Sequence, residues 1–379
     1  MKVLIAVTHL LGTGHLSRAL TLGRAFASEN HQVTVVSGGF PAPQLSPQGL
    51  QFEQLPPLRS DGVEFSRLLG TDGTVADEAY HARRRQQMQA LVQDQQPDVL
   101  ITELYPFGRR SLRGEFRALL EAAHALPRRP LVLSSIRDIL APPSKPKKAE
   151  DADAMIATYY DGVLVHSDPK ATTLDVSWPV SEMLASRLQY TGYVAPPAAA
   201  PHPEGLGKGE ILVSAGGGSV GDALYACAIE AAKLMPDYRW RILVGGTDAR
   251  ARIADLEDAG SPAILEPARP DFRAMLPHAA ASVSMCGYNT ALDLLQSGTP
   301  AVLVPFDAGK EVEQSLRAQS LSPLAGIEVE GAATLTPARL CAALSRAMHD
   351  TQRGLDGFEF DGAHRSVEIA ATLLRRQRA

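Results

Sequence analysis

A glycine turn followed by a histidine, near the start of the chain, is the first segment suited to chemistry. Gly12-Thr13-Gly14-His15-Leu16-Ser17-Arg18 places His15 at the predicted start of a helix. A neutral imidazole near pH 7 can accept a proton, so His15 is the first candidate for a general base. Arg18 can hold an anionic group. A histidine that only caps the turn would give the same pattern.

A second glycine run, Ser214-Ala215-Gly216-Gly217-Gly218-Ser219-Val220-Gly221, lies between an apolar strand and a helix. Without side chains, the backbone N–H groups of Gly217, Gly218 and Ser219 can approach a phosphate at the helix N-terminus. The run is neither a Walker motif nor a GxGxxG fingerprint. It predicts a site for a pyrophosphate, with a tight strand-to-helix turn as the structural alternative.

A third polar segment begins at Ser284. Gly287, Asn289 and Thr290 end a predicted strand and open a helix, so backbone donors and the Thr290 hydroxyl can meet phosphate oxygens. Asp293, one turn further, can accept two hydrogen bonds from ribose hydroxyls. A carboxylate that only complements the helix dipole is the alternative reading.

Further candidates follow other predicted strands. Glu313 and Gln314 come after Val304-Pro305-Phe306 and can read sugar hydroxyls, while Arg269 can stack its planar guanidinium on a base. Each of these three would look the same as an ordinary surface residue.

Three residues at predicted strand ends in the first half are candidates for acceptor binding or proton removal. They are Glu103, Arg137 and Asp138. A capping or loop role is the alternative for each. His166-Ser167-Asp168 contains two residue types of a catalytic triad but no nucleophile elbow, so we interpret it as a strand-end turn.

The elements that must position these residues form two similar halves. Continuous apolar runs separated by helical periodicity indicate parallel sheets covered on both faces. The predicted strands are Lys2–Val7, Gln32–Ser37, Pro97–Leu104, Leu131–Ile136, Gly162–His166, Glu210–Ser214, Trp240–Val244, Ala281–Met285 and Ala301–Val304. A proline-rich stretch separates the two halves, because it can neither continue a helix nor sit inside a sheet. We predict domains over 1–194 and 209–360, a linker over 195–208 and an amphipathic helix over 361–379.

The motifs together resemble the donor-binding signature of MurG-like glycosyltransferases with the GT-B fold, most closely over Gly287–Gln314. The resemblance implies an α/β protein with two Rossmann-like domains facing across a cleft, and an inverting, metal-independent glycosyltransferase of the hexosyltransferase type. The second domain would bind a nucleotide diphosphate sugar, UDP-linked by resemblance only. The family usually has Glu where this chain has Asp293, which is one methylene shorter.

The resemblance also assigns the first domain to the acceptor, through Gly12, Thr13, Gly14, Arg18 and Arg137. The Gly-x-Gly-His-x-x-Arg pattern is similar as well to PseG-type nucleotide-sugar hydrolases, which transfer the sugar to water. A nucleotide-sugar-binding protein without catalysis is a further alternative. The acceptor, the sugar and the oligomeric state are not specified by the sequence.

Composition excludes several classes of protein. Hydrophobic residues make up 45% of the 379 residues, and the net charge of -5 argues against a nucleic-acid binder. The apolar start Lys2–Val7 is too short for a signal peptide, and the three scattered cysteines suggest neither disulfides nor zinc. We therefore expect a cytoplasmic protein. Basic runs at 83–85, 109–110 and 142–148 leave open an anionic acceptor or peripheral contact with the inner face of a membrane, against a simply solvated surface.

Overall fold

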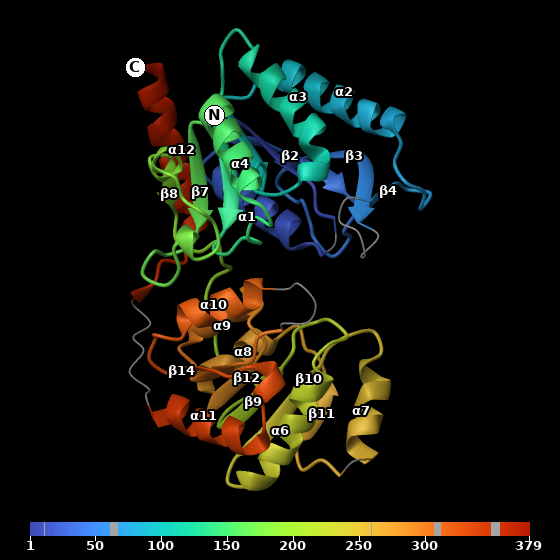
Figure 1. Cartoon of the computed structure of the whole chain (residues 1–379), viewed down its shortest axis with the longest axis vertical. Helices are drawn as coiled ribbons and strands as arrows, with labels where there is room; N and C mark the ends of the chain where they lie inside the picture. The colour runs from blue at the N-terminus through green and yellow to red at the C-terminus, as the bar shows by residue number, and fades with distance from the viewer. Residues whose placement is uncertain (11, 61–66, 259, 307–311, 350–356) are drawn as a thin grey trace. The chain divides into compact units, whose positions relative to one another are not determined.

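Two sheets organise the chain in the computed structural model (Figure 1). The structure describes residues 1–379 except 11, 61–66, 259, 307–311 and 350–356. The first unit comprises Met1–Pro169, Trp178–Val194 and Asp361–Ala379, and the second comprises Lys170–Ser177 and Ala195–Phe360.

The first sheet has eight strands in the order β4-β3-β2-β1-β5-β6-β7-β8. All neighbours pair in parallel except β3 and β4. Its strands are β1 (Lys2–Val7), β2 (Gln32–Gly39), β3 (Gln51–Ser60), β4 (Leu68–Leu69), β5 (Val99–Glu103), β6 (Leu131–Arg137), β7 (Gly162–His166) and β8 (Leu188–Tyr190). The helices of this unit are α1 (Gly14–Ser28), α2 (Glu78–Gln95), α3 (Arg113–His124), α4 (Pro146–Tyr159), α5 (Glu182–Ala185) and α12 (Gly362–Arg378), with a 3₁₀ turn at Arg110–Leu112.

Helix α12 completes the core of the first unit. Figure 1 shows it in red, packed with elements from the blue-to-green first half of the chain. Val367 and Ala370 are fully buried in one cluster with Leu20 and Phe26 of α1 and with β1 residues such as Ile5. The amphipathic face predicted from sequence therefore covers the first sheet together with α1.

The second sheet has six parallel strands in the order β11-β10-β9-β12-β13-β14. They are β9 (Glu210–Ser214), β10 (Arg239–Val244), β11 (Ile264–Pro267), β12 (Ala281–Ser284), β13 (Ala301–Leu303) and β14 (Ile327–Val329). The helices are α6 (Asp222–Leu234), α7 (Ala249–Asp258), α8 (Phe272–Met275), α9 (Tyr288–Ser297), α10 (Glu313–Leu321) and α11 (Pro337–His349), with 3₁₀ turns at Leu174–Val176, Leu276–His278 and Ala332–Thr334.

The proline-rich segment predicted as a linker packs as part of the second unit. The His202 backbone N–H donates to Ala274 O at 2.8 Å, and its ring Nε2 lies 3.0 Å from an Asp271 carboxylate oxygen. The carbonyls of Pro196 and Pro197 accept hydrogen bonds from Gln296 and Arg273. The prolines thus prevent a further strand, while the carbonyls of Pro196 and Pro197 hold the segment to the second unit through these hydrogen bonds.

Each sheet contains one point at which the strand order reverses. It lies between β1 and β5 in the first unit and between β9 and β12 in the second. Ligands of open α/β sheets bind outside the carboxyl ends of the strands at such a point. The segments beginning at Thr8 and Leu104 therefore define the expected site of the first unit, and those beginning at Ala215 and Met285 define that of the second.

Candidate functional site

His15, Arg18 and Glu103 form one buried cluster at the reversal point of the first sheet. Helix α1 carries His15 and Arg18 one turn apart, and Glu103 is the last residue of β5. His15 Nδ1 lies 3.0 Å from Glu103 Oε1, and Arg18 Nη2 donates to the same oxygen. The Glu103 side chain is 1% exposed and that of His15 is 16% exposed. Residues 88 positions apart thus form a histidine–carboxylate pair.

The cluster sets the ionisation of both partners. Burial lowers the pKa of His15 to about 4, against the opposing effect of Glu103. Burial alone would raise the pKa of Glu103, but the Arg18 guanidinium and the hydrogen bond from His15 outweigh it and hold that pKa well below its ordinary value. At neutral pH the site therefore contains a neutral imidazole and a carboxylate.

The contacts determine which imidazole nitrogen carries the proton. Glu103 is ionised and can only accept, so the 3.0 Å contact requires a proton on His15 Nδ1. Arg18 Nη2, 3.1 Å from that same nitrogen, is then a charged neighbour and not a donor to it. The lone pair is left on Nε2, which can accept a proton from a bound hydroxyl group.

The remaining predicted residues of the first unit lie around this cluster. Thr13 precedes α1 and its carbonyl accepts the Ser17 N–H at 2.9 Å, while a Cβ at Gly12 or Gly14 would meet nothing within 4 Å. Arg137 ends β6. The buried Asp138 carboxylate accepts the N–H of Ile139 at 2.7 Å, so one of its oxygens serves the local turn.

Sequence reasoning missed Ser135, set His166 aside as part of a strand-end turn, and considered Arg109 only within the basic run at 109–110. Arg109 donates to Thr8 O at 2.6 Å, and burial lowers its pKa to about 10. Ser135 of β6 donates to Glu103 Oε2 at 2.6 Å and lies 2.9 Å from Nε2 of His166, the last residue of β7. A serine within an apolar strand carries no sequence signal, and only the strand-end position of His166 pointed here.

The basic run at residues 83–85 is not a uniformly solvated surface. Arg84 is fully buried, and its guanidinium makes two hydrogen bonds of 2.7 and 2.8 Å to the Glu115 carboxylate. It also donates to Gly38 O at 3.0 Å. Arg84 therefore holds α2 to α3 and to the end of β2, and the reading of this arginine as part of an acceptor-binding or solvated surface was wrong.

In the second unit, the glycine run after β9 rests on the loop after β10. Gly246 N–H donates to Gly217 O at 3.1 Å, and the Ser219 hydroxyl donates to Asp248 Oδ1 at 2.7 Å. A Cβ at Gly245 would lie 2.2 Å from Gly216 O, so only glycine allows this approach. A Cβ at Gly217 would meet nothing within 4 Å, which leaves the outer face of the loop open to a ligand. Gly245, Gly246 and Asp248 were not among the sequence candidates.

The segment after β12 presents the start of α9 beside this loop. Gly287 is the N-cap residue, with Asn289 and Thr290 in the first turn, where N–H groups have no partner within the helix. Asp293 is mostly buried and its Oδ1 accepts a hydrogen bond from Arg273 Nε at 2.5 Å. Burial raises the pKa of Asp293 in opposition to that ion pair. One carboxylate oxygen is therefore already engaged, and Oδ2 is the one outside the pair.

Arg269 and the α10 residues are held by neighbours. Arg269 makes two hydrogen bonds of 2.8 and 2.7 Å to the Asp271 carboxylate, which fix the plane of its guanidinium. Gln314 Oε1 accepts the Phe306 N–H at 3.1 Å, and Glu313 begins α10 beside it. The buried Arg317, which sequence reasoning did not select, donates to Cys286 O at 3.1 Å and so links α10 to the loop before α9.

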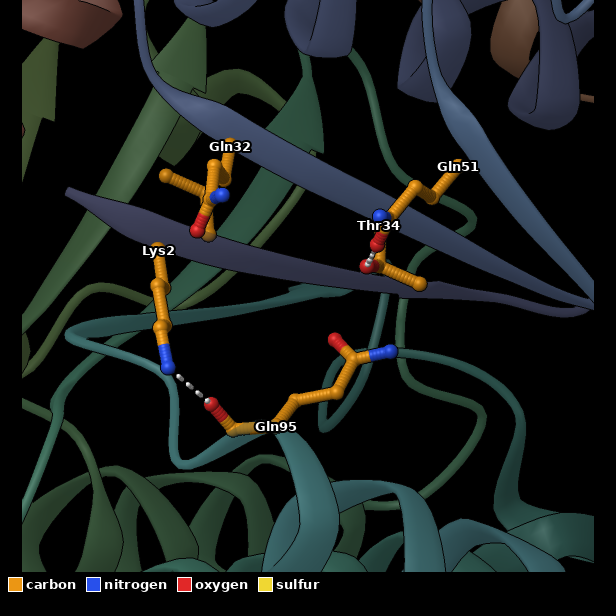
Figure 2. A pocket seen from close by; sticks show the side chains of 6 residues that line it. Lys2, Gln32, Thr34, Gln51 and Gln95 are labelled. Atoms are coloured by element: carbon orange, nitrogen blue, oxygen red, sulfur yellow. Dashed lines mark hydrogen bonds between the residues drawn. The ribbon is translucent and has the colours of Figure 1, made fainter.

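A separate pocket lies away from these residues. Figure 2 shows the lining residues Lys2, Gln32, Thr34, Gln51 and Gln95. The volume of this pocket is about 140 Å³. Lys2, Gln32 and Gln51 begin β1, β2 and β3, so the pocket is at the amino ends of parallel strands, opposite the His15 edge. Its position separates it from the candidate site.

The described part of the chain lacks two features that would have pointed to other functions. No helix in that part of the chain is both long and apolar enough to span a membrane. Among the same residues, no group of three or more His, Cys, Asp or Glu side chains is arranged to hold a metal ion.

Comparison with known proteins agrees with the architecture. Residues 212–359 match the glycosyltransferase family 28 C-terminal domain. The chain is 34% identical over 143 residues to the UDP-N-acetylglucosamine–N-acetylmuramyl-(pentapeptide) pyrophosphoryl-undecaprenol N-acetylglucosamine transferase of Brucella anthropi. That alignment covers 36% of this chain and only 38% of the relative. The protein of the same name from Brucella canis is 34% identical over 144 residues, with the same coverage.

Solved structures share the fold over nearly the whole chain. MurG of Acinetobacter baumannii superposes with a TM-score of 0.65 at 16% identity, covering 98% of this chain and 100% of that one. The calicheamicin glycosyltransferase CalG4 gives 0.61 at 16% identity, covering 99% of both. VinC, solved with dTDP, gives 0.62 at 15% identity, covering 99% and 100%.

The chain has the GT-B glycosyltransferase fold, and residues 212–359 are similar to the C-terminal domain of glycosyltransferase family 28. The fold class predicted from sequence, two parallel-sheet Rossmann-like units with a C-terminal helix, is confirmed.

Proposed function

We propose that this protein is a glycosyltransferase that moves a sugar from a nucleotide diphosphate sugar to the hydroxyl group of an acceptor, with inversion and without a metal ion. The observation that carries the proposal is the His15–Glu103 pair at the reversal point of the first sheet. A neutral imidazole whose Nδ1–H is held by a carboxylate, with Nε2 available, is the arrangement needed for general base catalysis.

The second unit supplies the donor site in this proposal. Gly217, Gly218, Ser219 and Thr290 would bind the diphosphate through backbone and hydroxyl donors, and all four lie within the matched family 28 segment. Such donors stabilise the charge on a leaving diphosphate, which is why a metal ion is not required. The relatives are named as transferases acting from UDP-N-acetylglucosamine, which favours a UDP-linked donor here.

Other side chains of the second unit would contact the base, the ribose and the sugar of the nucleotide sugar. Arg269, with its guanidinium edge on Asp271, would offer its face to the base. Asp293 Oδ2 would accept a ribose hydroxyl, and Glu313 and Gln314 would bind the sugar. Gly287 and Asn289 shape the start of α9 around the phosphates.

The first unit supplies the base and the acceptor site. His15 Nε2 takes the proton of the acceptor hydroxyl as its oxygen attacks the anomeric carbon, and the diphosphate leaves from the opposite side. This single displacement inverts the anomeric centre. Gly12, Thr13, Gly14 and Arg18, beside His15 in sequence, would form the acceptor site with Arg137 at the end of β6, and Asp138 would be a second candidate for proton removal.

The test is nucleotide release measured with purified protein, UDP-, dTDP- and GDP-sugars, and candidate acceptors. His15→Ala should lower kcat by about 10²–10⁴-fold while donor affinity stays within about twofold. Glu103→Gln should also lower kcat, because the amide no longer holds the Nδ1–H tautomer as a carboxylate does. Normal turnover in folded His15→Ala would remove His15 from the proposal.

A nucleotide-sugar hydrolase is the second candidate, favoured by the Gly-x-Gly-His-x-x-Arg sequence at 12–18. The same His15–Glu103 pair can activate water. Rapid nucleotide release from donor alone, abolished in His15→Ala and not accelerated by any acceptor, would establish hydrolysis in place of transfer.

The proposal also includes where in the cell the protein acts. We propose a cytoplasmic protein with peripheral contact to the inner face of the membrane, because the relatives are named for a pyrophosphoryl-undecaprenol acceptor. Sedimentation with vesicles containing anionic lipid tests this contact. Binding that is equal on neutral vesicles would contradict an electrostatic origin.

A further inference from the structure

A chain of buried polar side chains continues behind Glu103. Ser135 Oγ lies 2.6 Å from Glu103 Oε2 and 2.9 Å from His166 Nε2, and His166 Nδ1 lies 2.9 Å from Thr191 Oγ1. Ser135 and His166 are fully buried and Thr191 is 2% exposed. Glu103, Ser135 and His166 come from the adjacent strands β5, β6 and β7, and Thr191 directly follows β8.

The positions of the protons follow from the chemistry of each group. The single Ser135 hydroxyl proton goes to the Glu103 carboxylate, which can only accept. Ser135 must therefore accept from His166 Nε2–H. Burial lowers the pKa of His166 to about 3, so the ring is neutral and its Nδ1 can accept from the Thr191 hydroxyl at 2.9 Å. The same hydroxyl also lies 2.7 Å from Gly192 O, which competes for its proton. The donors of His166 and Ser135 both point toward Glu103.

We propose that Ser135, His166 and Thr191 are positioning residues that orient the Glu103 carboxylate and thereby fix the tautomer of His15. This inference rests on the proposed function of His15 as a base. The chain holds Oε2, while His15 and Arg18 share Oε1, so the carboxylate has one orientation. His166 selects that orientation. Because its Nε2–H donates to Ser135 Oγ, the Ser135 proton must point away from His166 and toward Glu103.

A purely structural role does not explain these residue types. Burying a serine, a histidine and a threonine costs free energy that each hydrogen bond only offsets, whereas apolar side chains of similar volume incur no such cost. Most other positions on these strands are leucine, valine and isoleucine, and the adjacent buried Ser134 donates to Tyr105 O at 2.8 Å. The directed chain therefore indicates a role for the polar groups beyond packing.

Few charged groups face the hydrogen-bond chain, so a change in the pKa of His15 can be assigned to that chain. Glu103 faces Arg18 and His15 from α1 and interacts with the buried Arg109 from the loop after β5. His166 is influenced by Arg18 and Glu103. Arg18, His15, Glu103 and Arg109 are present in every variant below, so differences between variants report on the hydrogen-bond chain.

The test uses two substitutions of one residue in the full chain. A glutamine amide reaches the place of His Nε2, so His166→Gln keeps a donor to Ser135. The shorter amide of His166→Asn reaches only the place of Nδ1 and leaves Ser135 without that donor. Both bury a similar amide, so loss of stability is shared. We expect kcat within about threefold of the wild type for His166→Gln and about 10–100-fold lower for His166→Asn, with KM unchanged in both.

Thr191→Val probes the far end of the chain. Without the threonine hydroxyl, His166 Nδ1 loses its donor, which weakens the preference of the ring for the Nε2–H tautomer. In any Nδ1–H fraction, Nε2 competes with Glu103 for the Ser135 proton. We expect kcat between those of the two His166 variants.

Nitrogen NMR of the two histidines gives a readout that does not depend on turnover. In the wild type, His166 should be a neutral Nε2–H tautomer and His15 a neutral Nδ1–H tautomer. His166→Asn frees the Ser135 hydroxyl to turn away from Glu103, which strengthens the His15–carboxylate interaction, so the pKa of His15 should rise by about half a pH unit or more. His166→Gln should leave that pKa unchanged.

The outcomes separate the two proposals. Equal loss of kcat in His166→Gln and His166→Asn, or an unchanged pKa of His15 in His166→Asn, would overturn the positioning role. A wild type that releases no nucleotide from any donor, but shows the expected tautomers and the selective rise in His15 pKa, would uphold the chain and overturn the proposed function.

Discussion

Burial keeps the His15 imidazole neutral over a wider range of pH than an exposed histidine would have. Its pKa is lowered from 6.5 to about 4, so the imidazole stays neutral through mildly acidic pH. We expect kcat/KM to stay level from pH 7 to about 5 and to fall near pH 4, because the base acts only when neutral. A pH–rate profile checks this, and an acid limb near pH 6.5 would contradict the desolvated site.

The same shift predicts the direction in which stability changes. The unfolded chain protonates His15 below about 6.5, whereas the folded chain does so only near 4, so the unfolded state binds more protons between these values. This residue's contribution should therefore lower stability as pH falls from 6.5 to 4. Urea unfolding of the wild type and of His15→Gln across that window measures the difference in stability, and this difference should stop changing with pH above about pH 7.

The Arg273–Asp293 pair allows the ribose contact to be separated from the ion pair. Asp293→Ala removes both, and should weaken nucleotide binding by about 1.5–3 kcal/mol. Arg273→Ala removes only the ion pair and leaves the Asp293 carboxylate, so nucleotide affinity should be kept. Calorimetric titration with UDP decides between them, and equal weakening in both variants would show that the ion pair matters in place of a ribose contact.

Among the elements, the loop after β10 determines the shape of the glycine loop after β9, the proposed site of the diphosphate. Gly246 has φ +98°, and a Cβ there would lie 2.2 Å from Ser219 Oγ. Gly246→Ala should displace Ser219 and lower nucleotide affinity about tenfold or more, since a loss of about 1.4 kcal/mol is tenfold. The control is Gly205→Ala, where φ is +71° but nothing lies within 4 Å. It should cost about 1 kcal/mol of stability and leave affinity unchanged.

Strand β3 shows why some elements escaped prediction. Its sequence, Gln51–Ser60, is polar and includes Pro56 and Pro57, which argue against a strand. The structure places both prolines where the register with β2 shifts, between the Ser37–Gln54 and Gly39–Leu58 pairs. There the ladder does not need their missing N–H groups. The strands β8, β11 and β14 escaped because each has only three or four residues and includes Gln189, Glu266 or Glu328, so none forms a continuous apolar run.

For the whole molecule, the two tryptophans make the units separately observable. Trp178 is buried in the first unit and Trp240 in the second, and the chain has no others. Val367→Ala in α12 removes a fully buried side chain from the first core and should destabilise that unit by about 2 kcal/mol. The exposed Arg376→Ala is the control, with an expected change below about 0.5 kcal/mol.

The measurement is fluorescence-monitored unfolding in Trp240→Phe and Trp178→Phe backgrounds. Val367→Ala should shift the Trp178 transition to lower denaturant, while the Trp240 transition stays in place. A shift confined to the Trp240 signal would place the stabilising effect of α12 in the other unit.

Local patterns in the sequence were sufficient for the two-sheet fold and for the glycine loops, because apolar runs, helical spacing and glycine turns act over a few residues. The contacts that give the site its chemistry depend on strand order. Glu103 meets His15 because β5 lies beside β1, and Ser135 and His166 join it because β6 and β7 follow in the sheet. Burial by the surrounding chain then lowers the pKa of His15. Desolvation and partners distant in sequence exist only once the sheet has formed, so only the tertiary structure could determine them.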